Sequence, residues 1–179
     1  MKEKLLIILG AGNSTIEIID LIEDINKKSL NRIKIVGILD DNKNLLNNKI
    51  SNVPIIGNMK EIRKFKKENF LLGMQSYKNR FRRSEFINFI KGNIKNFLTI
   101  VHPSSIIGSS TKIGHGCLIG NNCNIYSNSS VGNFCNISPN VSVAPKSNVK
   151  NNNFWSWLST ACCSTVEVTD SKSSTSSIS

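Results

Sequence analysis

Two histidines, His102 and His115, are the side chains of this 179-residue sequence best suited to exchange a proton near neutral pH. General base catalysis needs a group of that kind beside the attacking atom. His115 precedes Gly116 where the spacing of the sequence predicts a solvent-exposed corner, so His115 is a candidate base. His102 precedes Pro103 where the residue pattern of the sequence changes, and we interpret it as a structural residue of a domain junction.

A glycine turn is the second candidate for chemistry. Residues 10–15 read Gly-Ala-Gly-Asn-Ser-Thr, after an apolar run at 4–9 and before isoleucines at helical spacing. This order predicts strand, turn and helix, and the free N–H groups at a helix start bind phosphate. The third glycine of a dinucleotide fingerprint is missing, so a simple tight turn is the alternative to a nucleotide site. The candidate binding residues are Gly10, Gly12, Asn13 and Ser14.

Two carboxylates, Asp40 and Asp41, end a second apolar run at 33–39. Open α/β sheets bind ligands at the carboxyl ends of their strands, which makes both residues candidates for ligand binding. A polar turn from strand to loop before Asn42 explains them equally well. Both interpretations remain open at this point.

The elements that must hold these residues alternate between strand and helix. Apolar runs predict further strands at 54–57, 69–74 and 97–101, and helical periodicity predicts helices at 60–66 and 80–90. Continuous apolar runs are typical of parallel strands buried on both faces. Residues 1–101 are therefore predicted to form an α/β domain with a Rossmann-like open parallel sheet.

A six-residue repeat follows. Eight consecutive hexads from position 107 begin with Ile or Val, and their fifth positions hold small residues such as Cys117, Cys123 and Cys135. This period predicts a parallel β-helix in which three hexads form one coil and the first position points inward. We interpret the three cysteines as reduced core residues, neither disulfides nor metal ligands.

The repeat stops at Trp155, which stands where Ile or Val belongs. Residues 102–155 are thus assigned to the β-helix domain, and 156–179 to an irregular or disordered tail rich in Ser and Thr. The abrupt loss of register motivates the hypothesis that the tail is truncated or frameshifted near codon 155. The gene's nucleotide sequence tests this, because a frameshift predicts Ile-Gly hexads in another reading frame.

The net charge of +11 is concentrated in the first domain. Residues 1–100 hold 19 Lys or Arg against 10 acids, whereas 101–179 hold 4 against 2. No aromatic platform accompanies the charge, so we expect solvated helix faces, or attraction of a phosphorylated substrate, and no nucleic-acid binding. No apolar run approaches the roughly 20 residues of a membrane helix, so we expect no membrane span and a cytoplasmic protein.

The order of these motifs resembles the sialic acid O-acetyltransferase family of the NeuD and PglD kind. The resemblance rests on the glycine turn, on Val-Gly-Ile-Leu-Asp-Asp-Asn at 36–42, on Val-Pro-Ile-Ile-Gly at 53–57, on His-Pro-Ser-Ser at 102–105 and on the Ile-Gly hexads. It implies a left-handed β-helix, a homotrimer, acetyl-CoA bound between adjacent β-helices, and a nucleotide sugar held by the N-terminal domain. By position it places Gly12, Asn13, Ser14, Asp40, Asp41 and Gln75 at the sugar nucleotide.

The resemblance also exposes departures. Pro145 and Lys146 occupy the positions of the family's catalytic histidine and its acid, and Phe154 that of a histidine near acetyl-CoA. Proline accepts no proton, and His115 lies five hexads earlier, on another face of the β-helix. The implied function is an acetyl-CoA-dependent acetyltransferase for a nucleotide-activated sugar, lacking its usual base. The alternative is a non-catalytic nucleotide-sugar-binding subunit or a decayed family member. A dinucleotide-dependent oxidoreductase is disfavoured, because no catalytic Tyr-Lys set is visible.

Overall fold

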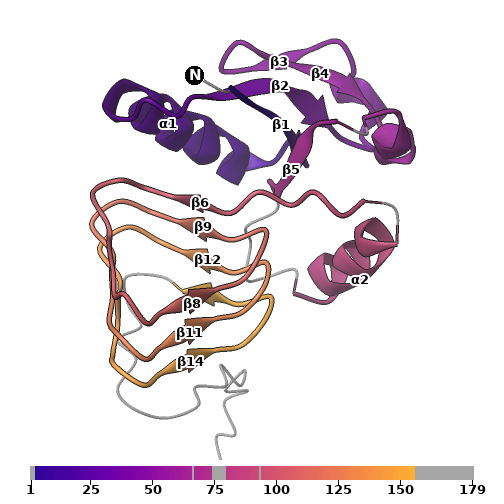
Figure 1. Cartoon of the computed structure of the whole chain (residues 1–179). Helices are drawn as coiled ribbons and strands as arrows, with labels where there is room; N and C mark the ends of the chain where they lie inside the picture. Colours follow the sequence, from indigo (N-terminus) through magenta and orange to yellow (C-terminus); the bar gives the residue numbers. More distant parts are fainter. Residues whose placement is uncertain (1–2, 66, 74–79, 93, 156–179) are drawn as a thin grey trace, which may run out of the picture.

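The chain folds into two stacked parts, an α/β layer and a left-handed parallel β-helix (Figure 1). The structure is a computed structural model that describes residues 3–65, 67–73, 80–92 and 94–155. The tail at 156–179 and Gln75 lie outside the described residues. Among the helices of the described part, none is long and apolar enough to cross a membrane.

The α/β layer is built on a five-stranded sheet of order β3-β4-β2-β1-β5. Its strands are β1 (Lys4–Leu9), β2 (Ile33–Leu39), β3 (Lys49–Ile50), β4 (Val53–Gly57) and β5 (Asn69–Leu72). Only β3 runs antiparallel, pairing with β4 at the edge of the sheet. Residues 6–9 of β1 are fully buried, as expected for a strand covered on both faces. The Rossmann-like prediction is confirmed.

Among the described residues of this layer, the helices are α1 (Asn13–Lys28), α2 (Arg80–Lys91) and the 3-10 helices η1 (Lys43–Leu45) and η2 (Met59–Lys64). The helix expected at 60–66 is the 3-10 helix η2, which ends at Lys64 and is capped by the side chain of Asn58. The strand expected at 69–74 is β5, which ends at Leu72.

The segment 97–101, expected as a strand of the α/β sheet, is divided between the two parts. Phe97 makes a single parallel bridge to Phe70 of β5. Ile100 and Val101 form β6, which pairs with a β-helix strand. Residues 100–101 join the β-helix because Val101 already belongs to the six-residue repeat. It lies six residues before Ile107 and occupies an inward position.

The β-helix consists of two-residue strands stacked in three parallel sheets. They are β6 (Ile100–Val101), β7 (Ile106–Ile107), β8 (Lys112–Ile113), β9 (Leu118–Ile119), β10 (Asn124–Ile125), β11 (Ser130–Val131), β12 (Asn136–Ile137), β13 (Ser142–Val143), β14 (Asn148–Val149) and β15 (Phe154–Trp155). Partners are 18 residues apart, so one coil contains three hexads, as predicted. The register continues through Trp155, which pairs with Ile137.

The interior of the β-helix is filled by the first and fifth positions of the hexads. The aliphatic side chains from Ile119 to Val149 at the first position are at most 3% exposed, and Cys117, Cys123 and Cys135 are free and buried. A hydrogen bond with Cys135 and burial raise the pKa of Cys117, and burial raises the pKa of Cys123. All three thiols are buried among the aliphatic side chains, which confirms the prediction that they fill the core.

The corners of the β-helix bring successive coils into close contact. A Cβ on Gly120 would lie 2.7 Å from the Pro139 nitrogen, and one on Gly132 would lie 2.6 Å from the Asn151 nitrogen. Real side chains do not tolerate such distances to backbone atoms. The Ile-Gly and Val-Gly steps of the sequence therefore reflect the spacing between coils.

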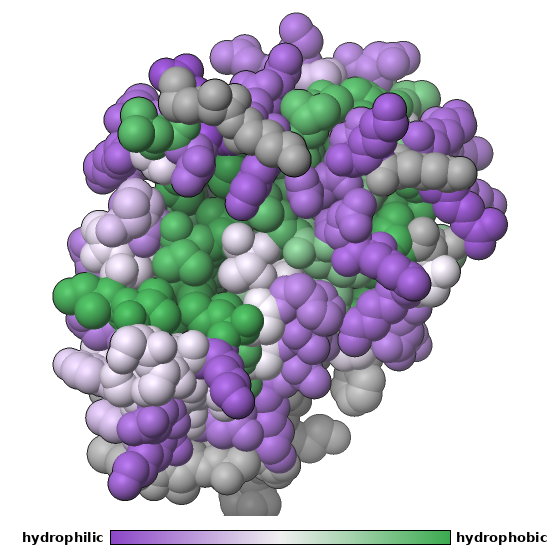
Figure 2. Space-filling view, in the orientation of Figure 1, coloured by the Kyte–Doolittle hydropathy of each residue, from purple (hydrophilic) through white to green (hydrophobic). Residues whose placement is uncertain are grey.

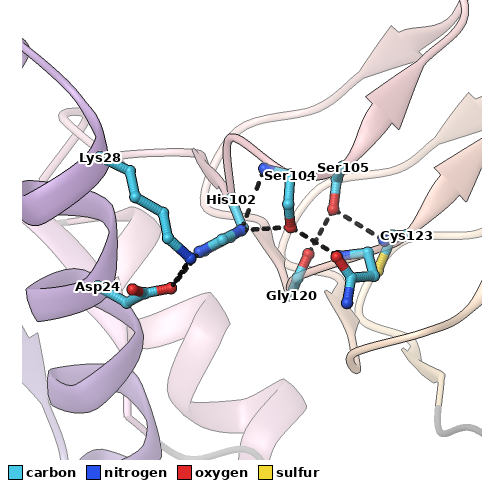
Figure 3. A network of polar contacts seen from close by, with 8 residues as sticks. Asp24, Lys28, His102, Ser104, Ser105, Gly120 and Cys123 are labelled. Atoms are coloured by element: carbon cyan, nitrogen blue, oxygen red, sulfur yellow. Dashed lines mark hydrogen bonds and ion pairs between the residues drawn. The ribbon is translucent and has the colours of Figure 1, made fainter.

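Two polar joints, each a set of hydrogen bonds and neighbouring contacts, connect the α/β layer to the β-helix. In the first, the buried His102 ring accepts the Ser104 backbone N–H on Nδ1, which leaves Nε2–H to donate to Asp24 of α1 at 2.8 Å (Figure 3). The Ser104 hydroxyl lies 2.7 Å from Nδ1 and also accepts the Asn122 backbone N–H. His102 thus connects α1 to the β-helix, as expected of a junction residue.

The second joint is made by α2. Arg83 is buried and donates to the Phe134 carbonyl at 2.8 Å and to the Asn152 side chain. The Phe134 ring packs edge-on against Phe97, with centroids 4.8 Å apart, and the Lys91 ammonium lies 5.0 Å from its centroid. These contacts pin α2 to the side of the β-helix.

The close approach of the coils predicts the effect of adding a methyl group. We expect Gly132→Ala to lower the free energy of unfolding by about 1–3 kcal/mol, because the new Cβ overpacks against backbone. Gly92→Ala is the matched control, since its Cβ would lie 3.6 Å from the nearest atom. Urea unfolding of both variants measures this, and equal stability of the two would contradict the packing argument.

The Asp24 joint predicts a dependence on acid. Hydrogen bonds from Lys28 and then from His102 lower the pKa of Asp24 from its ordinary 3.8. Because the folded pKa lies below the unfolded value, the stabilisation is present above about pH 4 and disappears as pH falls through the folded pKa. Asp24→Asn should therefore lose less stability than the wild type between pH 5 and pH 3, and the exposed control Asp20→Asn should not differ from the wild type.

Candidate functional site

The glycine turn is closed by short backbone contacts. Gly10 has a φ of 105°, which favours glycine, and its carbonyl accepts the Thr15 hydroxyl at 2.7 Å. A Cβ on Gly73 would lie 2.5 Å from the same carbonyl oxygen, so β5 also approaches the turn closely. This packing fixes the direction in which α1 leaves the turn.

The two candidate carboxylates hold the loops around this turn. Asp40 accepts the Ala11 N–H on Oδ2 at 2.7 Å and the Asn42 N–H on Oδ1 at 2.8 Å. Asp41 accepts the Met59 N–H at 3.0 Å and so holds the start of η2. Both side chains therefore lie at the carboxyl edge of the sheet and bind backbone donors there.

The N-terminus of α1 offers a favourable environment for an anion. Gly12 is its N-cap and provides no side-chain hydrogen bond, and no acidic residue lies in the first turn. Backbone N–H groups and the positive end of the helix dipole therefore face outward at Asn13 and Ser14. Phosphate binding at this turn stays a prediction, which rests on these backbone groups.

A cleft of about 340 Å³ lies between α1 and the outer face of the β-helix. Figure 2 shows hydrophobic side chains gathered in a hollow below α1, surrounded by hydrophilic ones. The helix contributes Ser14, Glu17, Ile18 and Leu21, and the β-helix contributes Leu118, Gly120, Asn136, Ile137, Ser138, Pro139 and Phe154. This mixture of an apolar wall with a few polar groups is typical of small-molecule sites.

The cleft brings together two of the residues singled out in the sequence, Ser14 and Phe154. Leu118, Asn136 and Phe154 follow one another at intervals of 18 residues and point outward from β9, β12 and β15. Sequence reasoning missed Glu17, Leu21 and Asn136. The 18-residue spacing of the outward position was the signal that could have found Asn136.

The proposed catalytic corner lies on another side of the β-helix. Pro145 and Lys146 follow β13, in the corner column that contains Ser127 one coil earlier. Both are exposed, and Lys146 has a φ of 60°. No imidazole lies in this column, because both histidines of the chain, His102 and His115, belong to others.

His115 occupies a corner beside α2. Its ring stacks 6.0 Å from Phe97 and meets Phe134 edge-on at 5.1 Å, and its backbone N–H donates to the Asn133 side chain. Its column continues through Asn133, whereas the Pro145 column contains Ser127. The structure therefore does not bring His115 to Pro145. Among the described residues, no three His, Cys, Asp or Glu side chains are placed to hold a metal ion.

Both parts of the chain have similar counterparts among known proteins. Residues 5–85 match the model of the PglD N-terminal domain. None of the curated proteins matches the sequence. Among solved structures, a point mutant of perosamine N-acetyltransferase from Caulobacter crescentus, in complex with CoA and GDP-perosamine, aligns with a TM-score of 0.67 at 15% identity, covering 83% of this chain and 67% of that one.

Two further structures share the fold. The acetyltransferase domain of PglB from Neisseria gonorrhoeae FA1090 aligns with a TM-score of 0.65 at 16% identity, covering 84% of this chain and 70% of that one. WeeI from Acinetobacter baumannii AYE aligns with a TM-score of 0.65 at 15% identity, covering 86% and 69%. Residues 5–85 are therefore similar to the PglD N-terminal domain, and the chain shares the fold of these solved acetyltransferase structures.

Proposed function

We propose that this protein binds a nucleotide-activated sugar in the cleft below α1 and acetylates it with acetyl-CoA as co-substrate. The observation that carries the proposal is the cleft itself, which runs from the N-terminus of α1 to the outward column of the β-helix. The similar perosamine N-acetyltransferase is described in complex with CoA and GDP-perosamine. A cleft shared by both parts of the fold explains why a nucleotide-binding layer is joined to a β-helix.

Each group in the cleft suits one part of such a substrate. The backbone N–H groups at Asn13 and Ser14 suit the diphosphate, with Asp40 holding the turn in place. The Asn136 side chain suits a sugar hydroxyl or amine, and the Phe154 ring offers a surface for stacking. By family resemblance, Gln75, Gly10, Gly12 and Asp41 belong to the same substrate site.

The quaternary part of the proposal is a homotrimer with acetyl-CoA between adjacent β-helices. Support comes from the sheet β7-β10-β13, where Ile106 is 68% exposed, and from Tyr126, which follows β10 and is 50% exposed. Large apolar side chains on an open β-helix face favour contact with another subunit. The reduced core thiols are consistent with a cytoplasmic location.

Acetyl transfer requires that the sugar amine or hydroxyl attack the thioester carbonyl, lose its proton and release the CoA thiol. Pro145 cannot take that proton, and Lys146 cannot orient a base in the way an acid does. This corner favours a second function, in which the protein binds the nucleotide sugar without transferring an acetyl group. Affinity and turnover measured on the same preparations separate the two functions.

The first experiment restores the base. We expect Pro145→His to raise acetylation of amino-sugar nucleotides by at least about 100-fold, because a positioned general base contributes about 10²–10⁴ to the rate. Asn121→His is the matched control, since it places a histidine at the same hexad position on another corner, and Asn121 does not line the cleft. Fast turnover by the wild type, or an equal gain in both variants, would show that the base lies elsewhere.

The second experiment tests the cleft. We expect Phe154→Ala to weaken nucleotide-sugar binding by about 5- to 160-fold, because stacking on an aromatic ring is worth about 1–3 kcal/mol. Asn148→Ala, an outward substitution on the β8-β11-β14 sheet, should bind as the wild type does. Isothermal titration with uridine and guanosine diphosphate sugars gives the affinities. Weaker binding of acetyl-CoA alone would instead assign Phe154 to the cofactor site.

A further inference from the structure

A second cavity lies on the face of the α/β sheet opposite to α1. Its volume is about 530 Å³, within the range of small-molecule sites. It is formed by η2, by the start of β5 and by the segment 94–96 that follows α2, and it is lined by Ile62, Arg63, Phe65, Phe70, Ile94, Lys95 and Asn96. Neither the glycine turn nor the β-helix contributes to it.

The two cavities lie on opposite faces of the sheet. Ile18 of α1 packs with Leu6 and Leu71 on one face, whereas Ile62 packs with Ile7 and Phe70 on the other. The buried strands β1 and β5 therefore lie between the second cavity and α1, and the two cavities have no described lining residue in common.

The floor of the second cavity is apolar and partly aromatic. Phe70 and Ile62 are 1% exposed and form its base, and the half-buried Phe65 borders it. The segment 96–98 is held against β5 by hydrogen bonds from Phe70 N–H to the Asn96 carbonyl and from Leu98 N–H to the Phe70 carbonyl. The wall is thus fixed by backbone pairing, which favours a preformed site for a flat apolar group.

The rim of the cavity is positively charged. Arg63 and Lys95 are exposed side chains that line it, and no described lining residue is acidic. Of the nearby acids, Glu61 pairs with Lys64 at 2.7 Å and Glu68 accepts the Lys67 backbone N–H. Residues 60–68 carry five Lys or Arg against two Glu, so the local field is positive.

We propose that this second cavity binds a small aromatic phosphate, with the ring against Phe65 and Phe70 and the phosphate between Arg63 and Lys95. An apolar floor accepts a ring, and a guanidinium with an ammonium accepts a doubly charged anion. The Asn96 amide adds a hydrogen-bonding group at the same opening. The site is independent of the proposed acetyltransferase function, because it shares no residue with the cleft below α1.

The test uses the full chain and phenyl phosphate, which contains the ring and the anion without a ribose. We expect saturable binding by phenyl phosphate, at least about tenfold tighter than by inorganic phosphate or by phenol, because each of these lacks one half of the interaction. In amide NMR spectra, the shifts should centre on residues 62–65 and 94–96. Shifts centred on residues 11–15, or equal affinity for inorganic phosphate, would overturn the proposal.

Charge reversal gives the matched control. Arg63→Glu should weaken phenyl phosphate binding by at least about fivefold, since it replaces attraction by repulsion at the rim. Lys64→Glu changes the charge equally on the neighbouring residue, which pairs with Glu61 and does not line the cavity. Equal losses in both variants would mean that the general positive field, and no built site, holds the anion. Unchanged thermal unfolding of Arg63→Glu would confirm that the loss is local.

Discussion

The contact between α1 and the outer face of β6 and β9 is the interaction on which the arrangement of this protein depends. Ile18 and Ile22 of the helix pack in one buried cluster with Ile100 and Leu118, which point outward from the first two coils. The sheet and the β-helix thereby share a single helix as their common layer. Where the column continues to Asn136 and Phe154, α1 no longer covers it fully, and the cleft opens there. The position of the cleft is thus a consequence of where the helix stops covering the coil.

The repeat was predictable because its constraint is local. A buried first position every six residues is visible in the sequence, and β7 to β14 follow it without a gap. Its start was missed because residues 97–101 are apolar except for Thr99, a pattern that an α/β strand and a first coil explain equally well. The 3-10 helix η2 was expected as an ordinary helix, since Ile62 and Phe65 are three residues apart and apolar spacing alone does not separate the two.

The site was only partly predictable, because it depends on contacts between distant segments. The glycine turn and Asp40 lie in one βα unit, and their neighbourhood followed from the strand order. Glu17 and Asn136 are 119 positions apart, and nothing in their spacing relates a helix face to an outward coil position. Arg83 was equally hidden, because a charged residue on a helix predicts a solvated face, whereas here it binds the Phe134 carbonyl in a buried joint.

In the β-helix, the residues that fill the interior are different from those at the corners, where the proposed chemistry would take place. Its stability rests on the first and fifth positions, which fill the interior, whereas the fourth forms the turn, where residues such as Asn128, Phe134 and Lys146 adopt positive φ. The third position does not fill the interior, although Asn133 and Asn151 there accept backbone N–H groups of the preceding coil, and histidine, serine, asparagine and proline all occur at it. The exposed Pro145 therefore contributes no packing to the core. Such a chain keeps its fold whichever residue stands at that corner. The shared fold therefore says more about its structural relatives than about its chemistry.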